Sequence, residues 1–240
     1  MRRMPLLILS LLLGLPAAGA AGPIHNFASL SPGANTSLGS GLVSVGPVTA
    51  QGFSFKSGVW APDVLIARNV TNDHGLGVCS ETPLSDCRLG GFGAGDWNEL
   101  SQLEYPEAIL FSIADGFRWT ELWVSSLDGG GTGGTEEGRV HWGNSSAIAS
   151  LLGGPSFAFD FGNFGAAVEG DILSLAAAAA FDPDARYVLF VPDGTVGQNN
   201  DYLVWGASTE PVPEPGTLFL LGTGAAALAR ARGRRARSRG

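Results

Sequence analysis

Several acidic and amide residues of this sequence have side chains and spacing that could bind a calcium ion. Ca²⁺ takes about six to eight oxygen ligands, which carboxylates, amides and backbone carbonyls on loops supply. Loops beside two expected strands carry such side chains, which could converge: Asp182, Asp184, Asp193, Asn199, Asn200 and Asp201. The alternative is that these side chains cap solvated turns. Calcium is therefore a candidate ligand, and no other cofactor is expected.

An enzyme active site has less support. The sequence contains three scattered histidines: His25, His74 and His141. They lack the HxH or HExxH spacing of a zinc site, so we expect no transition metal. The GxSxG turn of serine hydrolases is also absent. A glycosidase needs two carboxylates, and pairs occur at Glu136-Glu137 and Asp182-Pro183-Asp184, but such pairs are common on an acidic surface. We expect a non-enzymatic protein, with a glycan-active hydrolase as the weaker alternative.

Two tryptophans are candidates for stacking on sugars. Trp97 and Trp142 lie in or next to glycine-rich loops, where an exposed indole ring could contact a glycan. Large aromatic side chains in a β-sheet protein more often lie in or near the core. A carbohydrate-binding module is therefore a second functional hypothesis, and a structural role for both rings is its alternative.

The two cysteines, Cys79 and Cys87, are close together in the sequence. In an exported chain an even number of cysteines at short spacing predicts a disulfide bond that closes one loop. The spacing is not that of a CxxC metal or redox motif. The alternative is a pair of free thiols in a mobile loop.

Short β-type runs between turn residues must position these side chains. Glycine is abundant, with 36 residues, and helical periodicity is weak. Asp115-Gly116 predicts a hairpin turn, and the glycine-rich runs 90–95 and 129–134 predict loops. The ambiguous run 172–181 is assigned as a strand. The other expected strands are Leu42–Val48, Gly52–Lys56, Val64–Thr71, Ala108–Ile113, Phe117–Leu127, Ser156–Phe161, Arg186–Val191 and Tyr202–Ala207.

Alternation within these runs predicts which side chains share a face. One expected face carries Ile109, Phe111 and Ile113, and another carries Phe117, Trp119 and Trp123. The run 188–191 is apolar on both faces, which is typical of a central strand. Many short strands joined by Gly and Pro turns predict an all-β protein, a single antiparallel β-sandwich of jelly-roll-like form.

Both ends of the chain carry transport signals. Arg2 and Arg3, the apolar run 6–15 and the small residues 18–20 predict a signal peptide over residues 1–20. At the other end, an apolar segment from Leu218 to Ala229 follows Pro213-Glu214-Pro215 and precedes six arginines. Twelve residues are few for a membrane crossing, which needs about 20. We therefore expect transient anchoring in the inner membrane and removal of this segment.

The tail resembles the PEP-CTERM sorting signal of exopolysaccharide-producing bacteria. Pro213, Glu214 and Pro215 match its motif, and the apolar segment and arginine-rich end follow in the same order. The resemblance implies export through the Sec machinery and processing by exosortase, a transpeptidase-like membrane enzyme. It further implies a place at the cell surface or in the extracellular matrix, with exopolysaccharide as a partner.

The body resembles the extracellular domains that are often joined to such tails. Its matching segments are Gly75–Val78, Asn98–Ser101, with Ser101 where an Asp is usual, and Asp201–Val204. The expected organisation is a signal peptide (1–20), a β-sandwich (21–207), a short stalk (208–212) and a sorting signal with a transmembrane helix (213–240). Arginines concentrate at the two ends, so the body is acidic, which argues against binding to nucleic acid.

Overall fold

The computed structural model describes residues 22–70, 73–80, 99–101, 105–127, 129–131, 134–160, 173–175, 181–193, 202–213, 222–228 and 230. Among the strands, the described residues form two short helices: the 3₁₀ helix η1 (Phe27–Leu30) and the α-helix α1 (Ile148–Leu152). The strands are β1 (Ile24–Asn26), β2 (Asn35–Gly39), β3 (Val43–Val45), β4 (Val48–Lys56), β5 (Val59–Val70), β6 (Asp73–Cys79), β7 (Glu107–Ile113), β8 (Phe117–Ser125), β9 (Gly129–Gly131), β10 (Gly134–Thr135), β11 (Glu137–Gly143), β12 (Ser156–Asp160), β13 (Leu173–Ser174), β14 (Tyr187–Pro192) and β15 (Leu203–Pro211).

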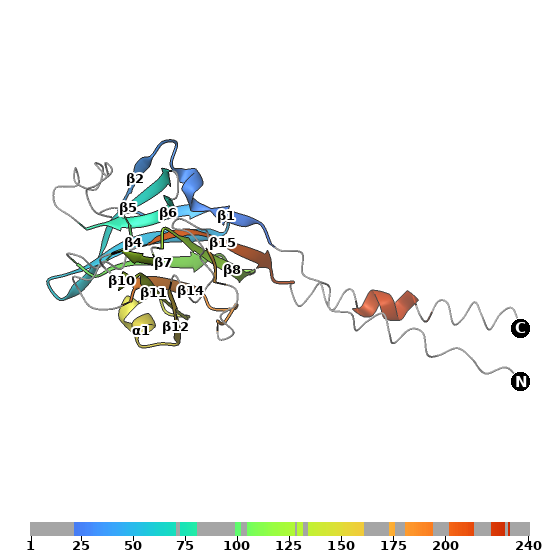
Figure 1. Ribbon diagram of the computed structural model, residues 1–240. Coiled ribbons are helices and arrows are strands. Elements are labelled where there is room, and N and C mark those ends of the chain that lie inside the picture. The colour runs from blue at the N-terminus through green and yellow to red at the C-terminus, as the bar shows by residue number, and fades with distance from the viewer. Residues whose placement is uncertain are drawn as a thin grey trace, which may run out of the picture.

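One curled antiparallel sheet contains nearly all of these strands, in the order β12-β11-β14-β7-β4-β5-β6-β15-β8-β13 (Figure 1). The long strand β5 joins its two halves. Residues 59–63 pair with β4, and residues 64–70 pair with β6. The all-β antiparallel expectation is therefore confirmed, in the form of a single curled sheet.

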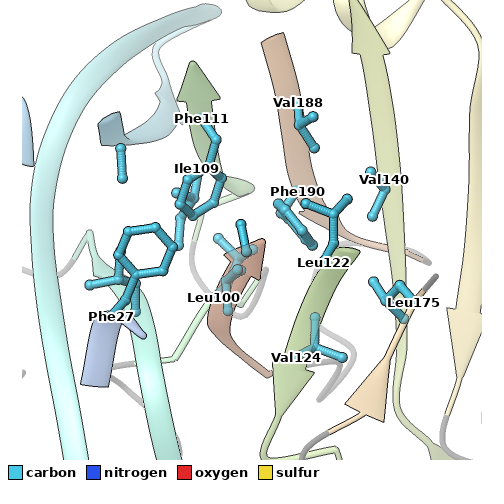
Figure 2. Packing of buried hydrophobic residues seen from close by; sticks show 14 of the residues in the cluster. Phe27, Leu100, Ile109, Phe111, Leu122, Val124, Val140, Leu175, Val188 and Phe190 are labelled. Carbon is cyan, nitrogen blue, oxygen red and sulfur yellow. The ribbon is translucent and has the colours of Figure 1, made fainter. Parts of the chain in front are cut away.

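The curl closes the sheet around one main core. Ile109 and Phe111 of β7 and Phe190 of β14 are buried together with Leu122 and Val124 of β8 (Figure 2). The face predicted for Ile109, Phe111 and Ile113 is confirmed. The strands that flank the turn at 114–116 thus contribute to the same core from different parts of the sheet.

A second, smaller core lies on the outer face of β7 and β14. Leu110 of β7 and Leu189 and Val191 of β14 pack there against Ile148 and Leu151 of α1. β14 lies between β11 and β7, so the central position predicted from its two-sided apolar run is confirmed. The helix α1 was not predicted, because a five-residue segment is too short to show helical periodicity.

A β-bulge overturns the face predicted for Trp123. Ser208 pairs with Glu121 but the next residue, Thr209, pairs with Trp119, so Thr120 is skipped. One extra residue reverses the faces of all that follow it. Trp119 therefore points into the main core, whereas Trp123 points outward and contacts Trp205 with ring centroids 5.7 Å apart.

Asp115-Gly116 forms a turn but not a hairpin. β7 pairs with β4 and β14, and β8 pairs with β15 and β13, so both edges of β7 are taken by other strands. The tight hairpin lies instead between β4 and β5, where Ser57 and Gly58 have φ of 53° and 83°. Both residues at positive φ are the signature of a type I′ turn, which matches strand twist.

Other boundaries also differ from expectation. The strand expected at 42–48 divides at Gly46, whose φ is 60°, into β3 and β4. The loop expected at 129–134 contains most of the small β9–β10 ladder. The strands β1, β2, β6 and β11 were not predicted. β13 covers residues 173–174 of the strand expected at 172–181. The signal peptide at 1–20 lies outside the described residues.

The stalk expected at 208–212 is not a separate segment. Residues 208–211 belong to β15, where they pair with β8, and Thr209 is fully buried. The short polar residues at 208–210 suggested a linker, but they belong to a strand of the sheet. Farther along the tail, residues 222–228 are helical. Within the described part of the chain, no helix has the length and apolar character needed to cross a membrane.

Candidate functional site

The end of β15 is the candidate functional site, because the body meets the Pro-Glu-Pro segment there. Pro211 pairs with Phe117 of β8, and the N–H of Val212 donates to the carbonyl of Gly116 at 2.8 Å. Val212 and Pro213 are exposed. The sheet therefore continues to within one residue of the segment, whose Glu214 and Pro215 lie outside the described residues.

The N-terminal strand lies at the same place. Ile24, His25 and Asn26 of β1 pair with Ser208, Ala207 and Gly206 of β15 (Figure 1). His25 is buried, and its Nε2 lies 3.0 Å from Oγ1 of Thr209. Burial lowers the pKa of His25 below its usual range. The two ends of the body thus leave it side by side.

Surface ion pairs surround this end. Arg118 of β8 pairs with Glu210 of β15, and Arg186 pairs with Asp115 of the neighbouring turn. The Asp115 side chain is 98% exposed. Exposed pairs of this kind contribute about 1 kcal/mol or less to stability. They therefore set the charge of the surface here and add little to the stability of the body.

The opposite end of the body carries the β4–β5 hairpin. β4 and β7 are antiparallel, with Val48 opposite Ile113 and Ser54 opposite Glu107. Ile113 precedes the turn beside Val212, so the hairpin after Lys56 lies at the far end of these strands. The two ends of the body therefore have different surroundings.

The acidic residues proposed for calcium are divided by β14. Asp182 and Asp184 are exposed before this strand, and Asp193 follows its other end, about 20 Å away for six extended residues. Asp182 Oδ1 accepts the N–H of Asp184, which is the turn-capping alternative, and Asp193 pairs with Arg139 at 2.6 Å. Asn199, Asn200 and Asp201 lie outside the described residues. Among the residues that are described, no three His, Cys, Asp or Glu side chains gather to hold a metal.

Trp142 is not available to a glycan. It is 5% exposed and packs in the main core against Phe157 and Phe181, with centroids 5.9 and 5.5 Å away. The expectation of an exposed platform at Trp142 is therefore wrong. This expectation was based on the glycine-rich loop near Trp142. It did not foresee the strand β11, which places Val140 and Trp142 on the inner face of the sheet. Trp97 lies outside the described residues.

The remaining candidates fall in structural positions. Cys79 is disulfide-bonded and fully buried; Cys87, its expected partner, lies outside the described residues. Glu136 is 3% exposed and Glu137 is exposed, so this pair does not face one cleft. His74 lies in β6, where its Nδ1 is 2.9 Å from Asn69 Oδ1, and His141 is buried in β11.

Glu107 is a buried carboxylate that sequence reasoning did not single out. It is 1% exposed, and its two oxygens accept the N–H groups of Ser80 at 3.1 Å and Ser101 at 2.8 Å. These serines flank the segment 81–98, so one carboxylate holds the chain on both sides of it. A glutamate directly before the apolar run 108–111 was the signal in the sequence that could have identified it.

The three segments that carry the resemblance of the body meet at one place. Leu76 of the first segment pairs with Val204 of the third, and Leu100 of the second exchanges backbone hydrogen bonds with Tyr202 at 2.8 and 3.4 Å. Gly75 has φ of 142°, and a Cβ there would lie 2.6 Å from the carbonyl oxygen of Val204. The segments therefore serve packing around β15.

An ion-pair network lies beside this meeting point. Arg68 of β5 pairs with Asp73 at 2.6 Å and with Glu99, which is 2% exposed, at 2.8 Å. The hydroxyl of Ser126 lies 2.9 Å from both carboxylates. Because every member is bonded to another, the network connects β5, β6 and the chain after β8.

Comparison with known proteins identifies the tail. Residues 211–235 match the family model of the PEP-CTERM protein-sorting motif. The match begins at Pro211, the last residue of β15. The chain therefore carries a sorting signal directed to exosortase, as the tail predicted. No curated protein and no solved structure matches this chain.

Proposed function

We propose that this protein is a non-enzymatic component of the extracellular polysaccharide layer, exported by Sec and processed at its C-terminus by exosortase. The sorting motif at 211–235 is the observation that carries the proposal. The body is then a β-sandwich whose two layers are joined through β5. Its acidic surface suits a soluble extracellular protein.

Truncation tests the sorting role directly. A chain ending at Pro213 keeps the whole of β15 but lacks the tail, so it should fold and be exported without being retained or processed like the full chain. The measurement is the distribution of the protein between cell and medium, with mass spectrometry of its C-terminus. Identical localisation and an identical C-terminal residue for both chains would contradict the proposal.

Glycan binding at the far end of the body is a second candidate function. Phe55 and Trp60 form a cross-strand pair on the β4–β5 hairpin, with centroids 5.4 Å apart, and Phe55 is 37% exposed. Tyr105 is 38% exposed and lies 5.2 Å from Nζ of Lys56. Exposed rings offer apolar faces to a neutral sugar, and this end points away from the tail.

Pull-down with purified exopolysaccharide tests this candidate. Phe55→Ala with Tyr105→Ala should weaken retention of the body, whereas Leu42→Ala, at an apolar residue that is 70% exposed elsewhere, should not. Equal retention of the wild-type protein, the double variant and Leu42→Ala would show that the hairpin does not bind the glycan.

A further inference from the structure

Three short motifs in the sequence have the pattern of an acceptor for an N-linked glycan. The pattern is Asn, any residue except Pro, and then Ser or Thr, and in a secreted protein it marks a surface loop. It occurs at Asn35-Thr36-Ser37, Asn69-Val70-Thr71 and Asn144-Ser145-Ser146. A three-residue pattern is frequent by chance, so the surroundings of each motif decide which of them an enzyme can reach.

Strand pairing holds the first two motifs. Residues 35–37 belong to β2, which pairs with β5, and Asn35 is half-buried. Asn69 and Val70 belong to β5, where Asn69 pairs with His74 and its Oδ1 lies 2.9 Å from Nδ1 of that histidine. An enzyme that binds an extended acceptor segment would have to break these backbone ladders first.

The third motif lies outside the ladders of the sheet. The pairing of β11 with β14 ends at Gly143, and α1 begins at Ile148, so Asn144, Ser145 and Ser146 belong to the connection between them (Figure 1). All three residues of the motif are exposed. Surface connections are more mobile than the elements they join, and they can be rearranged without loss of the core. The third motif is therefore open to a modifying enzyme after the body has folded.

The side chain of Asn144 is held through its oxygen atom. Its Oδ1 accepts the backbone N–H of Arg186 at 3.0 Å, and the guanidinium of Arg186 pairs with Asp115. This bond engages the carbonyl end of the amide, whereas an N-linked glycan is attached at the Nδ2 end. Gly116, which follows Asp115, accepts the N–H of Val212. The motif therefore lies at the end of the body from which the sorting tail departs.

We propose that Asn144 is a glycosylation site, to which a membrane oligosaccharyltransferase adds a glycan after export. The donor is an oligosaccharide linked to a lipid diphosphate. Nδ2 of Asn144 forms a bond to the anomeric carbon of the first sugar, and the bond from that carbon to the diphosphate oxygen breaks. The lipid diphosphate leaves, and the proton that Nδ2 loses goes to solvent. This inference requires export, which is part of the proposed function.

Mass spectrometry of tryptic peptides tests the proposal on the full-length protein exported by its natural host. Trypsin cuts after Lys and Arg, which places the three motifs in three different peptides, and the third motif falls in residues 140–186. Asn144→Gln moves the amide out of the motif, and Ser146→Ala removes the hydroxyl that the motif needs. Ser146→Thr keeps that hydroxyl. Ser145→Ala is the matched control, because it removes the neighbouring exposed hydroxyl and leaves the motif intact. The melting temperature of each variant checks folding.

We expect peptide 140–186 to carry the mass of a glycan in the wild-type protein, in Ser145→Ala and in Ser146→Thr. In Asn144→Gln and Ser146→Ala the peptide should have its unmodified mass, and the whole protein should migrate faster on a denaturing gel. An unmodified peptide in exported wild-type protein, a glycan on the first or second motif only, or a glycan that persists in Asn144→Gln would overturn this inference alone. A wild-type chain that stays in the cytoplasm would overturn the proposed function and this inference with it.

Discussion

His25 and Thr209 join the first and last strands of the body, with 3.0 Å between Nε2 and Oγ1. Both side chains are buried, 8% and 0% exposed, although they stand at opposite ends of the folded sequence. The contact lies only a few residues from Pro213. The body is therefore closed next to the start of the sorting motif.

Two truncations should separate the tail from the body. A chain ending at Pro213 should unfold with the same free energy as the full-length protein, because β15 is intact. A chain ending at Ser208 loses Thr209 and the pairs of residues 209–211 with β8. It leaves His25 buried without its partner and should be less stable by about 2–4 kcal/mol. Urea unfolding measures the free energy of unfolding of both truncated chains. Equal values would show that residues 209–211 do not stabilise the body, as expected of a separate stalk.

Glu107→Gln should destabilise the body by about 2 kcal/mol, because the amide NH₂ cannot accept one of the two N–H groups that the carboxylate holds. Glu210→Gln is the matched control, since Glu210 pairs with Arg118 near the surface and should cost about 1 kcal/mol or less. Urea unfolding compares the two variants. Equal losses would show that Glu107 does not hold the segment ends in the way its contacts indicate.

Gly75→Ala should cost at least about 2 kcal/mol, because the new methyl group meets the Val204 carbonyl at 2.6 Å and φ is 142°. Gly33→Ala provides the comparison, since a Cβ there has no neighbour within 4 Å and the backbone is not left-handed. That change should alter stability by about 0.5 kcal/mol or less. Thermal unfolding distinguishes them, and a harmless Gly75→Ala would show that the strands can shift apart.

Stability should fall as the pH drops below about 6.5, the usual histidine value. Burial lowers the pKa of His141, with Arg139 acting in the same direction and Leu151 and Asp193 opposing, and burial also lowers that of His25. Between the folded pKa and about 6.5 the unfolded chain binds more protons, so acid favours unfolding; below the folded pKa the loss levels off.

His141→Leu should reduce this pH dependence while changing stability at about pH 7 by about 1 kcal/mol or less, because Nδ1 of His141 is buried without a hydrogen-bond partner. Urea unfolding from about pH 7 to about pH 5 measures the slope. An unchanged slope in His141→Leu would mean that His25 or other groups carry the whole effect.

Local patterns predicted the strands that tertiary structure leaves undisturbed. Residues 188–191, apolar on both faces, indicated the central strand β14, and the tail indicated the sorting signal. Trp123 was assigned to the wrong face because the bulge at Thr120 depends on the register with β15. The Asp115-Gly116 turn was recognised, but which strands pair across it depends on competition for the edges of β7.

The candidate site was visible only in part for the same reason. Pro213 could be identified from the tail, whereas Thr209 and His25 looked like loop residues because their contacts span most of the chain. Trp142 could not be assigned to the core without knowing that β11 is a strand. The calcium hypothesis assumed that loops at both ends of β14 converge. The six residues of this strand separate Asp182 and Asp184 from Asp193, and the hypothesis stays a prediction for Asn199, Asn200 and Asp201, which lie outside the described residues.

β15 is last in the sequence but lies inside the sheet, between β6 and β8. On the Sec route that we propose, β6 and β8 have no strand between them, and the main core stays open, until residue 211 has emerged from the export channel. The chain can therefore be threaded through the membrane without a finished body resisting its passage. The strand that completes the fold is followed at once by the sorting motif, so folding is completed just as the motif emerges.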